Sequence, residues 1–272
     1  MVKNHIHAFL RNPRTLLAAT AAVRAFFPPR CPGCGRVMEM DREGFCESCM
    51  PQVERVPEPA CMKCGSPIER GEGEYCPRCR QVNYVFRQNK AAFVYRGAVK
   101  DAMYDFKYKN RRSYGEVFAR ELVEAHRQWL LLRQPEVIVP IPMNRSKERE
   151  RGYNQAMALA QYLEKWIRIL CPSLDISVKP IVERSRSTVP LKGLSPHIRR
   201  KNLKKAFKIR KNVVNLYGMH SDRGKCPFRR VLLVDDIFTT GATLDAVSEL
   251  LLEQGICVEV CCMTAAISRN LH

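Results

Sequence analysis

Two features are scarce in this 272-residue chain: long apolar runs and acidic side chains. No apolar run approaches the roughly 18 residues that a helix needs to span a bilayer, so we expect no transmembrane segment. Only 27 Asp and Glu stand against 46 Lys and Arg, which gives a formal net charge of +19. Such a field favours polyanions, either nucleic acids or phosphorylated small molecules, over a basic surface that serves only solubility.

Glycine and lysine are missing where common nucleotide-binding loops need them. Segment Val231 to Val247 joins an apolar strand to a helix through a loop with one glycine and no lysine after it. This excludes a P-loop and a dinucleotide fingerprint. The loop instead offers hydroxyl groups at a helix start, where free N–H groups attract an anion. We predict phosphate contacts from Thr239, Thr240, Gly241, Ala242 and Thr243, and sugar-hydroxyl contacts from Asp235 and Asp236. An ordinary strand, Asx turn and helix cap is the alternative.

Cysteine, by contrast, is abundant, with 13 in the chain. Eight of them form two copies of one C-x2-C-x11-C-x2-C pattern, which indicates an internal duplication and predicts two structural Zn²⁺ sites. A disulfide scaffold is the alternative; metal binding instead favours a reducing, cytoplasmic location. Sequential pairing within each repeat gives two zinc ribbons, which we favour, and an interleaved pairing stays open. The predicted ligands are Cys31, Cys34, Cys46 and Cys49, then Cys61, Cys64, Cys76 and Cys79.

The first 30 residues carry an apolar stretch, 15–23, after three basic residues. Arg24 interrupts this stretch early, which disfavours a signal peptide. Its apolar positions follow helical spacing, so we predict an amphipathic helical segment over 1–30 that packs on the protein or makes a peripheral membrane contact.

From residue 81 onward the sequence alternates apolar strands with amphipathic helices, which predicts an α/β domain over 81–272 behind a zinc-ribbon module over 31–80. Strands are expected at 91–95, 136–141, 213–217, 231–234 and 258–265. Helices are expected after 97, over 114–132, after 155, and over 242–253 with Gly255 as the cap.

Two basic segments of this domain are candidate contacts for pyrophosphate or nucleic acid. The first, predicted as a loop after strand 136–141, contributes Arg145, Arg149 and Arg151. The second is predicted to begin as a mobile loop, which contributes Lys192, and to continue as a candidate short helix over 196–204, which contributes Arg199. Ligands of open α/β sheets bind beyond the carboxyl ends of the strands, where the first loop would lie. A solvated run of charge is the alternative. Tyrosines among these cations can stack on bases, although core packing is favoured for any one of Tyr104, Tyr108, Tyr114 and Tyr153.

The order of apolar strand, two acids and Thr/Gly loop resembles the phosphoribosyl pyrophosphate (PRPP) motif of type I phosphoribosyltransferases. In that motif the loop holds the 5′-phosphate and the acids hold the ribose hydroxyls. The whole chain resembles the ComF family, a competence-associated branch of this fold. The resemblance rests on the cysteine ribbons, VIVPIP at Val137 to Pro142, RGYNQA at Arg151 to Ala156, the segment Arg186 to Phe207, and VDDIFTTGAT at Val234 to Thr243.

The resemblance implies a type I phosphoribosyltransferase-like fold, a largely parallel sheet flanked by helices. It also implies a role in natural transformation, with single-stranded DNA and a competence helicase as partners. Two departures stand out. Leu191 replaces the Gln that family members commonly carry, and the glutaminase half of amidophosphoribosyltransferases is missing.

The sequence therefore supports two hypotheses. In the first, a basic phosphoribosyltransferase-like domain handles single-stranded DNA and keeps a PRPP-type site. In the second, the chain is an active phosphoribosyltransferase that uses PRPP and Mg²⁺, the ion being carried mainly by pyrophosphate oxygens, with an unknown acceptor.

Overall fold

The computed structural model describes residues 28–39, 42–71, 73–185, 203, 205–216 and 226–268. The helix predicted over 1–30 falls almost wholly outside these residues, as do Leu191, Lys192 and Arg199. Among the helices that are described, none has the length and apolarity to cross a membrane.

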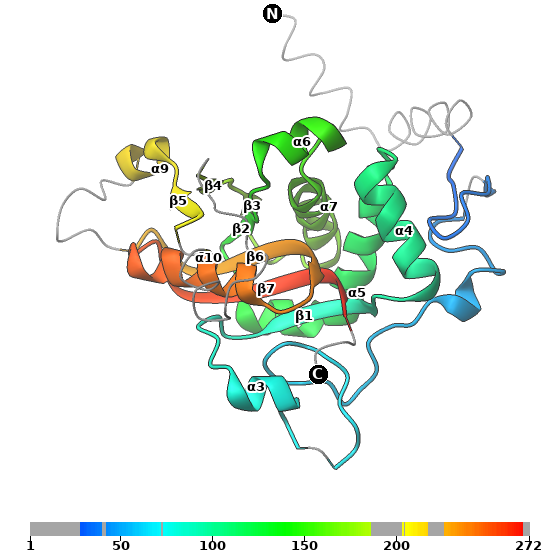
Figure 1. Cartoon of the computed structure of the whole chain (residues 1–272), viewed down its shortest axis with the longest axis horizontal. Helices are drawn as coiled ribbons and strands as arrows, with labels where there is room; N and C mark the ends of the chain where they lie inside the picture. Colours follow the sequence, from blue (N-terminus) through cyan, green and yellow to red (C-terminus); the bar gives the residue numbers. More distant parts are fainter. Residues whose placement is uncertain are drawn as a thin grey trace, which may run out of the picture.

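A five-stranded parallel sheet forms the centre of the molecule, with strand order β1-β7-β6-β2-β3 (Figure 1). The strands are β1 (Asn89–Val94), β7 (Cys257–Ile267), β6 (Phe228–Phe238), β2 (Val137–Pro140) and β3 (Ser177–Val178). Residue 140 of β2 is paired with residue 234 of β6. The carboxyl end of β2 and the acids that follow Val234 therefore lie at one edge of the sheet.

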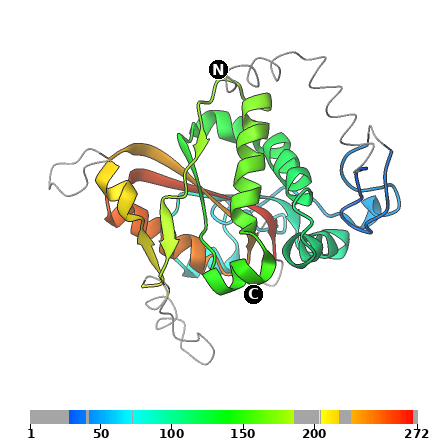
Figure 2. The same ribbon diagram turned by 90° about the horizontal axis from the view of Figure 1, so that it is seen from above.

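Successive residues of β6 point to opposite faces, and each face has its own core. Leu232 and Val234 pack with helices α4 (Gly97–Tyr108), α5 (Tyr114–Arg133) and α7 (Gln155–Leu170). Val231 and Leu233 pack with α10 (Ala242–Glu253) and a small antiparallel pair, β4 (Val182–Arg184) and β5 (Phe207–Ile209). Figure 2 shows the two layers from above. Burial on both faces explains why the apolar runs of β2 and β6 are continuous.

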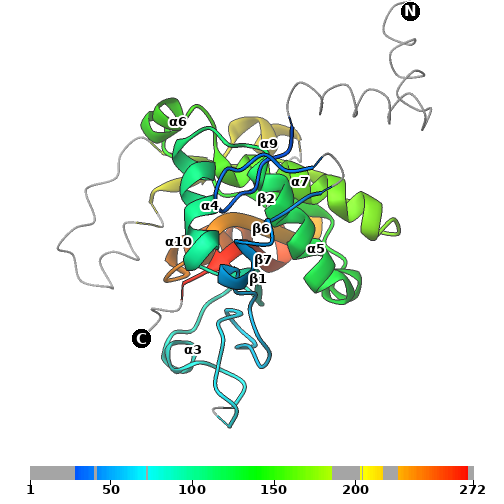
Figure 3. The same ribbon diagram turned by 90° about the vertical axis from the view of Figure 1, so that its right-hand side faces the viewer.

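The two cysteine repeats lie at separate places and pack on different cores. The first holds the short helix η1 (Met50–Gln52) and lies beside α4 and α5, where Cys31, Phe45 and Cys49 join the core of those helices. The second is followed by α3 (Pro77–Gln81) and lies below β1 in Figure 1, where Cys61, Cys64 and Cys76 join the opposite core. Figure 3 shows the first module in front of helices α4 and α5 and the second below β1.

Two sequence-based predictions were wrong. The strand expected at 213–217 is a helix over its described part, α9 (Lys211–Leu216); five apolar-rich residues fit either period, and β5 already pairs with β4. The loop expected after β2 contains helix α6 (Arg145–Arg151). Its N-cap is Asn144, whose side chain accepts a hydrogen bond from the Ser146 amide, a capping signal that the run of charges hid.

Candidate functional site

The loop between β6 and α10 has the form that the sequence predicts. Gly241 is the N-cap of α10 and has φ of +72°, a conformation that disfavours other residues. A Cβ atom there would lie 2.6 Å from the Phe238 ring and 3.0 Å from the Tyr84 ring, so only glycine fits. Thr239 and Thr240 are exposed, and Ala242 and Thr243 are partly buried. Together they surround the amino terminus of α10, where free N–H groups favour an anion.

The two acids lie within the last residues of β6, which runs to Phe238 and so exceeds the predicted strand. The Asp236 amide donates a hydrogen bond to Asp235 Oδ1 at 2.9 Å. Burial of the Asp235 carboxylate, followed by the nearby charge of Asp236, raises the pKa of Asp235 to about 7. Lys107 Nζ lies 3.0 Å from Asp236 Oδ1, with both side chains only about 15% exposed. The charge of Asp236 is thus partly neutralised by Lys107, whereas the carboxyl of Asp235 has a pKa near 7.

Lys107 is a site residue that the sequence analysis did not single out. It comes from α4, more than 120 positions before Asp236 in the chain. A largely buried lysine needs a charged partner, and no feature of the sequence indicates which residue that partner is.

Tyr84 and Asp245 support the loop from behind, and neither was predicted. The Tyr84 hydroxyl donates to the Thr240 carbonyl at 2.8 Å. The amide of Val85 donates to Asp245 Oδ1 at 2.7 Å, and Asp245 is only 2% exposed. An acid on the buried face of the apolar helix α10 was the available signal, because such a group requires a donor.

A cavity of about 730 Å³ lies between the β2–α6 turn, α7 and the β4–β5 pair. It is lined by Arg112, Arg145, Arg184 and Arg210, against Glu148 and Glu183. The Nε atoms of Arg184 and Arg210 are buried without a hydrogen-bond partner among the described residues. Arg184 lines the cavity, and its positive charge partly opposes the rise in the pKa of Asp235. The cavity suits an anion.

The predicted cations divide between two places. Arg145 lines the cavity. Arg151 instead turns toward α4, where its Nη2 donates to Tyr108 Oη at 3.0 Å, and Arg149 is exposed on α6. The tyrosines divide as well: Tyr114 and Tyr153 are buried, 3% and 7% exposed, as core packing predicts, whereas Tyr104 and Tyr108 are more than half exposed.

The eight predicted metal ligands form two separate four-cysteine clusters, and in each cluster the four sulfur atoms lie within 4.8 Å of one another. Sequential pairing is therefore confirmed. Sulfurs bound tetrahedrally to zinc at 2.3 Å lie about 3.8 Å apart. The observed Sγ–Sγ distances of 3.7 Å, Cys34 to Cys46 and Cys64 to Cys76, fit that geometry. Each cluster fits one structural zinc ion and leaves no ligand position for substrate.

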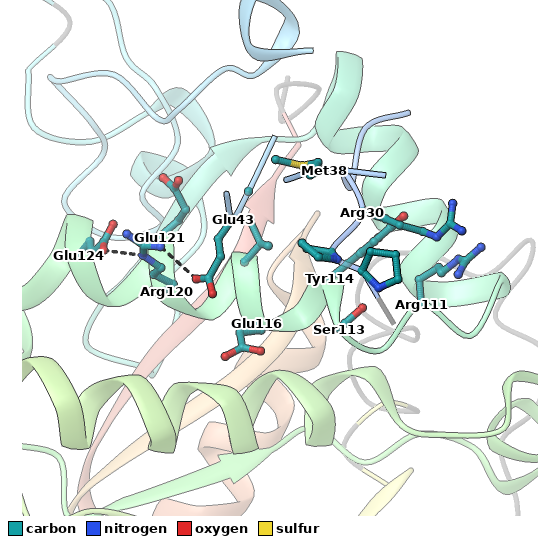
Figure 4. Close-up of a pocket in the computed structure, with 14 residues that line it drawn as sticks. Arg30, Met38, Glu43, Arg111, Ser113, Tyr114, Glu116, Arg120, Glu121 and Glu124 are labelled. Atoms are coloured by element: carbon teal, nitrogen blue, oxygen red, sulfur yellow. Dashed lines mark hydrogen bonds and ion pairs between the residues drawn. The ribbon is translucent and has the colours of Figure 1, made fainter. Parts of the chain in front are cut away.

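A second cavity, of about 640 Å³, lies between the first cysteine repeat and α5 (Figure 4). Its charged lining is largely paired: Arg120 contacts Glu43 and Glu124, and Arg55 contacts Glu121. Because four carboxylates line it, this cavity suits a phosphate ligand poorly. The loop, the acids and the arginine cavity remain the candidate site.

Comparison with known proteins agrees with this architecture. Residues 22–80 match the family model of the double zinc ribbon domain, and residues 121–272 match that of the phosphoribosyl transferase domain. "Competence protein F" of Haemophilus influenzae is 32% identical over 234 residues, 85% of this chain and 94% of the relative. "DNA utilization protein YhgH" of Escherichia coli K12 is 28% identical over 69% of this chain and 76% of its own length.

A third relative, "Competence protein ComFC" of Bacillus subtilis, is 25% identical over 66% of this chain and 64% of its own. Two cysteine clusters, a parallel sheet with an acid–threonine loop, and these relatives lead to one conclusion: the chain belongs to the ComF family, in which a double zinc ribbon precedes a phosphoribosyltransferase domain.

Proposed function

We propose that this protein handles single-stranded DNA during natural transformation, in the cytoplasm, and keeps a PRPP-type site in its phosphoribosyltransferase domain. The observation that carries the proposal is the pairing of β2 with β6. The pairing supports the proposal because the segment after β2, which lines the arginine cavity, follows a strand that lies beside β6, which carries the acids and leads to the Thr239–Thr243 loop. The names of the relatives, competence and DNA utilization proteins, support the same role.

The PRPP-type part of the proposal assigns one chemical task to each group. The loop Thr239 to Thr243 binds the 5′-phosphate through backbone amides and hydroxyls. Asp235 and Asp236 accept hydrogen bonds from the ribose hydroxyls, and the arginines of the cavity face the pyrophosphate or a DNA phosphate. Lys107 keeps the charge of Asp236 compensated while the site is open to solvent.

The second candidate function is phosphoribosyl transfer from PRPP with Mg²⁺ to an unknown acceptor. The intact acid pair favours it. In such a transfer positive charge grows on the sugar and negative charge on the departing pyrophosphate, which Arg145 and Arg184 are placed to stabilise. Lys192 and Arg199 remain predicted contributors. No described group identifies the acceptor, so DNA handling is the preferred function.

Titration of the zinc-loaded protein with PRPP and with a short single strand, alone and in competition, tests the proposal. We expect both to bind, and the single-strand affinity to fall steeply as salt rises, because several phosphates are neutralised. Asp235→Asn together with Asp236→Asn should abolish Mg²⁺-dependent PRPP binding and leave the fold unchanged. A salt-independent DNA affinity would contradict DNA handling, and unaltered PRPP binding in the double variant would contradict the ribose assignment.

A further inference from the structure

Tyr104 and Tyr108 form a pair of exposed aromatic rings on α4. They are four residues apart, on one face of the helix, with ring centroids 5.0 Å apart and an interplanar angle of 42°. Their exposed fractions are 54% and 52%, while the other face of α4 buries Val99, Met103 and Phe106 completely. The core therefore does not account for these two rings.

Arg151 of α6 extends the pair by a third planar group. Its guanidinium carbon lies 4.7 Å from the centre of the Tyr108 ring. Two hydrogen bonds fix it there, from Nη2 to Tyr108 Oη at 3.0 Å and from Nη1 to Gln155 Oε1 at 3.1 Å. A guanidinium that is held in place and lies over an aromatic ring presents a further flat, cationic surface.

The stack is surrounded by cations that suit a phosphate backbone. Lys109 Nζ lies 5.8 Å from the centre of the Tyr104 ring. Arg112 Nη2 donates to the Gly152 carbonyl at 2.8 Å, which joins the turn after α4 to the turn after α6. The exposed cations of α4, the turn after it and α6 are Lys100, Lys109, Arg111, Arg112, Arg145, Lys147 and Arg149, interspersed with Asp101, Asp105, Glu148 and Glu150, of which Asp105 pairs with Lys109 at 2.9 Å.

A pair of tyrosines that merely stabilises its helix would contribute little and would need no cationic surroundings. Flat rings among cations are the arrangement by which proteins bind single strands irrespective of sequence, since every unpaired base has a π-face and every nucleotide a phosphate. A duplex keeps its bases stacked internally and cannot use such rings.

We propose that Tyr104, Tyr108 and Arg151 form a stacking site for the unpaired bases of a single strand. This inference rests on the proposed DNA handling and deepens it. Lys107, one residue before Tyr108, contacts Asp236, so a strand stacked on α4 passes next to the PRPP-type site. The predicted ligand is any unpaired base, without sequence preference.

Fluorescence anisotropy with two 12-nucleotide probes tests the site: oligothymidine, and an abasic phosphodiester of the same length. Stacking strengthens binding roughly five- to hundredfold per base. Tyr104→Ala with Tyr108→Ala should therefore weaken oligothymidine binding at least tenfold and leave the abasic probe within about twofold. Tyr104→Phe with Tyr108→Phe keeps the rings and should keep most of the affinity.

Tyr75→Ala is the matched control, because Tyr75 is another exposed tyrosine, at 43%, on the second cysteine repeat. We expect it to bind both probes normally. Photo-crosslinking of 5-bromodeoxyuridine strands to the unmodified protein provides a second readout that needs no variant, and adducts should map to Tyr104 or Tyr108.

The outcomes separate the two proposals. If the unmodified protein binds neither probe, DNA handling fails and the stacking site fails with it. If it binds oligothymidine but the double alanine variant loses nothing, or loses affinity for both probes equally, the stacking site is overturned while DNA handling stands. Crosslinks that all fall outside α4 and α6 would likewise overturn it.

Discussion

The two cysteine repeats share one spacing but are attached to the α/β domain in different ways. In the first repeat the aromatic before the second Cys pair, Phe45, is 6% exposed and packs edge-on against Phe93 at 6.0 Å. Its counterpart in the second repeat, Tyr75, is 43% exposed. The same module therefore presents one surface to the core in one copy and to solvent in the other.

The polar contacts differ as well. The first repeat is held to the helical layer, where Tyr114 Oη donates to the Cys31 carbonyl at 3.3 Å. The second is tied to β1 through Asn89, whose Nδ2 donates to the Cys64 carbonyl at 2.9 Å and whose amide donates to Lys63 at 2.8 Å. The chain between this repeat and β1 carries Tyr84, whose hydroxyl contacts the loop between β6 and α10.

The two copies of the repeat therefore pack against different parts of the α/β domain. The first lies behind the helical layer that displays the proposed stacking site, and the second lies behind the loop of the proposed PRPP site. Substitutions that unfold the second repeat should weaken PRPP binding, and substitutions that unfold the first should leave PRPP affinity unchanged.

Loss of one zinc ligand should give the largest contrast. Cys34→Ser and Cys64→Ser change equivalent ligands, of which Cys34 is exposed and Cys64 is 1% exposed. A module this small folds only with its metal. We expect Cys64→Ser to weaken PRPP binding at least tenfold and Cys34→Ser to leave it within about twofold, each losing one zinc.

Calorimetry with PRPP, beside metal analysis of the same samples, measures this contrast. Equal losses of PRPP affinity in the two variants would contradict separate supports. Thermal unfolding curves serve as the control, because a Cys34→Ser protein that unfolds entirely would show that the first repeat holds the whole domain together.

A glycine at the same position of each repeat provides a milder test. Gly35 and Gly65 have nearly equal φ values, +73° and +75°. A Cβ at 35 would meet nothing within 4 Å, whereas one at 65 would lie 2.9 Å from the Asn89 carbonyl oxygen. Backbone strain should lower the free energy of unfolding of both alanine variants by about 1 kcal/mol. The close approach to Asn89 should lower that of Gly65→Ala by roughly a further 1 to 3 kcal/mol.

Denaturant unfolding of the two variants gives the difference directly. The shared φ makes Gly35→Ala the internal control for strain. If both lose the same free energy of unfolding, the second repeat is not in close contact with β1.

The sequence predicted those parts of the molecule that depend on local pattern. Cysteine spacing identified both clusters, and four apolar residues followed by two acids identified β6 and its loop. Gly255 was expected to cap α10 and does so with φ of +62°. At 213–217 the prediction failed, because a short apolar-rich run fits the period of a helix as well as that of a strand.

The partners that reach the site from distant segments could not be predicted. Lys107 lies on α4, Arg184 on β4 and Tyr84 in the segment between α3 and β1, and only the folded chain brings them close to β6 and its loop. Nor does cysteine spacing reveal that two repeats with the same spacing pack on opposite cores, since that depends on the residues around each repeat.

The pH dependence of PRPP binding should sharpen the contrast between the repeats. With the pKa of Asp235 raised to about 7, its carboxyl is largely protonated at pH 6. Ribose hydroxyls donate to the ionised form, so PRPP affinity should rise roughly tenfold from pH 6 to pH 8. Cys34→Ser should keep this slope, and Cys64→Ser should lose it because its loop is disturbed.

Asp235→Asn removes the titrating group and reports the slope that comes from PRPP itself. The effect on stability has the opposite sign. Above the unfolded pKa of about 3.9, the unfolded chain loses its proton while folded Asp235 retains it up to about 7, so the contribution of this group to stability falls as pH rises between those values. If PRPP affinity does not change with pH once the slope measured for Asp235→Asn is subtracted, the ribose role of Asp235 is contradicted.

Removal of one oxygen atom should give the smallest measurable effect. Tyr84→Phe deletes the hydroxyl that donates to the Thr240 carbonyl and keeps the ring, which stacks on Phe86 with centroids 5.0 Å apart. A hydrogen bond of this kind contributes about 1 kcal/mol, so PRPP affinity should fall about fivefold.

The first repeat offers a matched change, Tyr114→Phe, which deletes a hydroxyl bonded to the Cys31 carbonyl. That variant should lose similar stability but no PRPP affinity, because its lost bond lies behind the helical layer and not behind the loop. If Tyr114→Phe weakens PRPP binding as much as Tyr84→Phe does, the two repeats act on the site through the shared core and not through separate contacts.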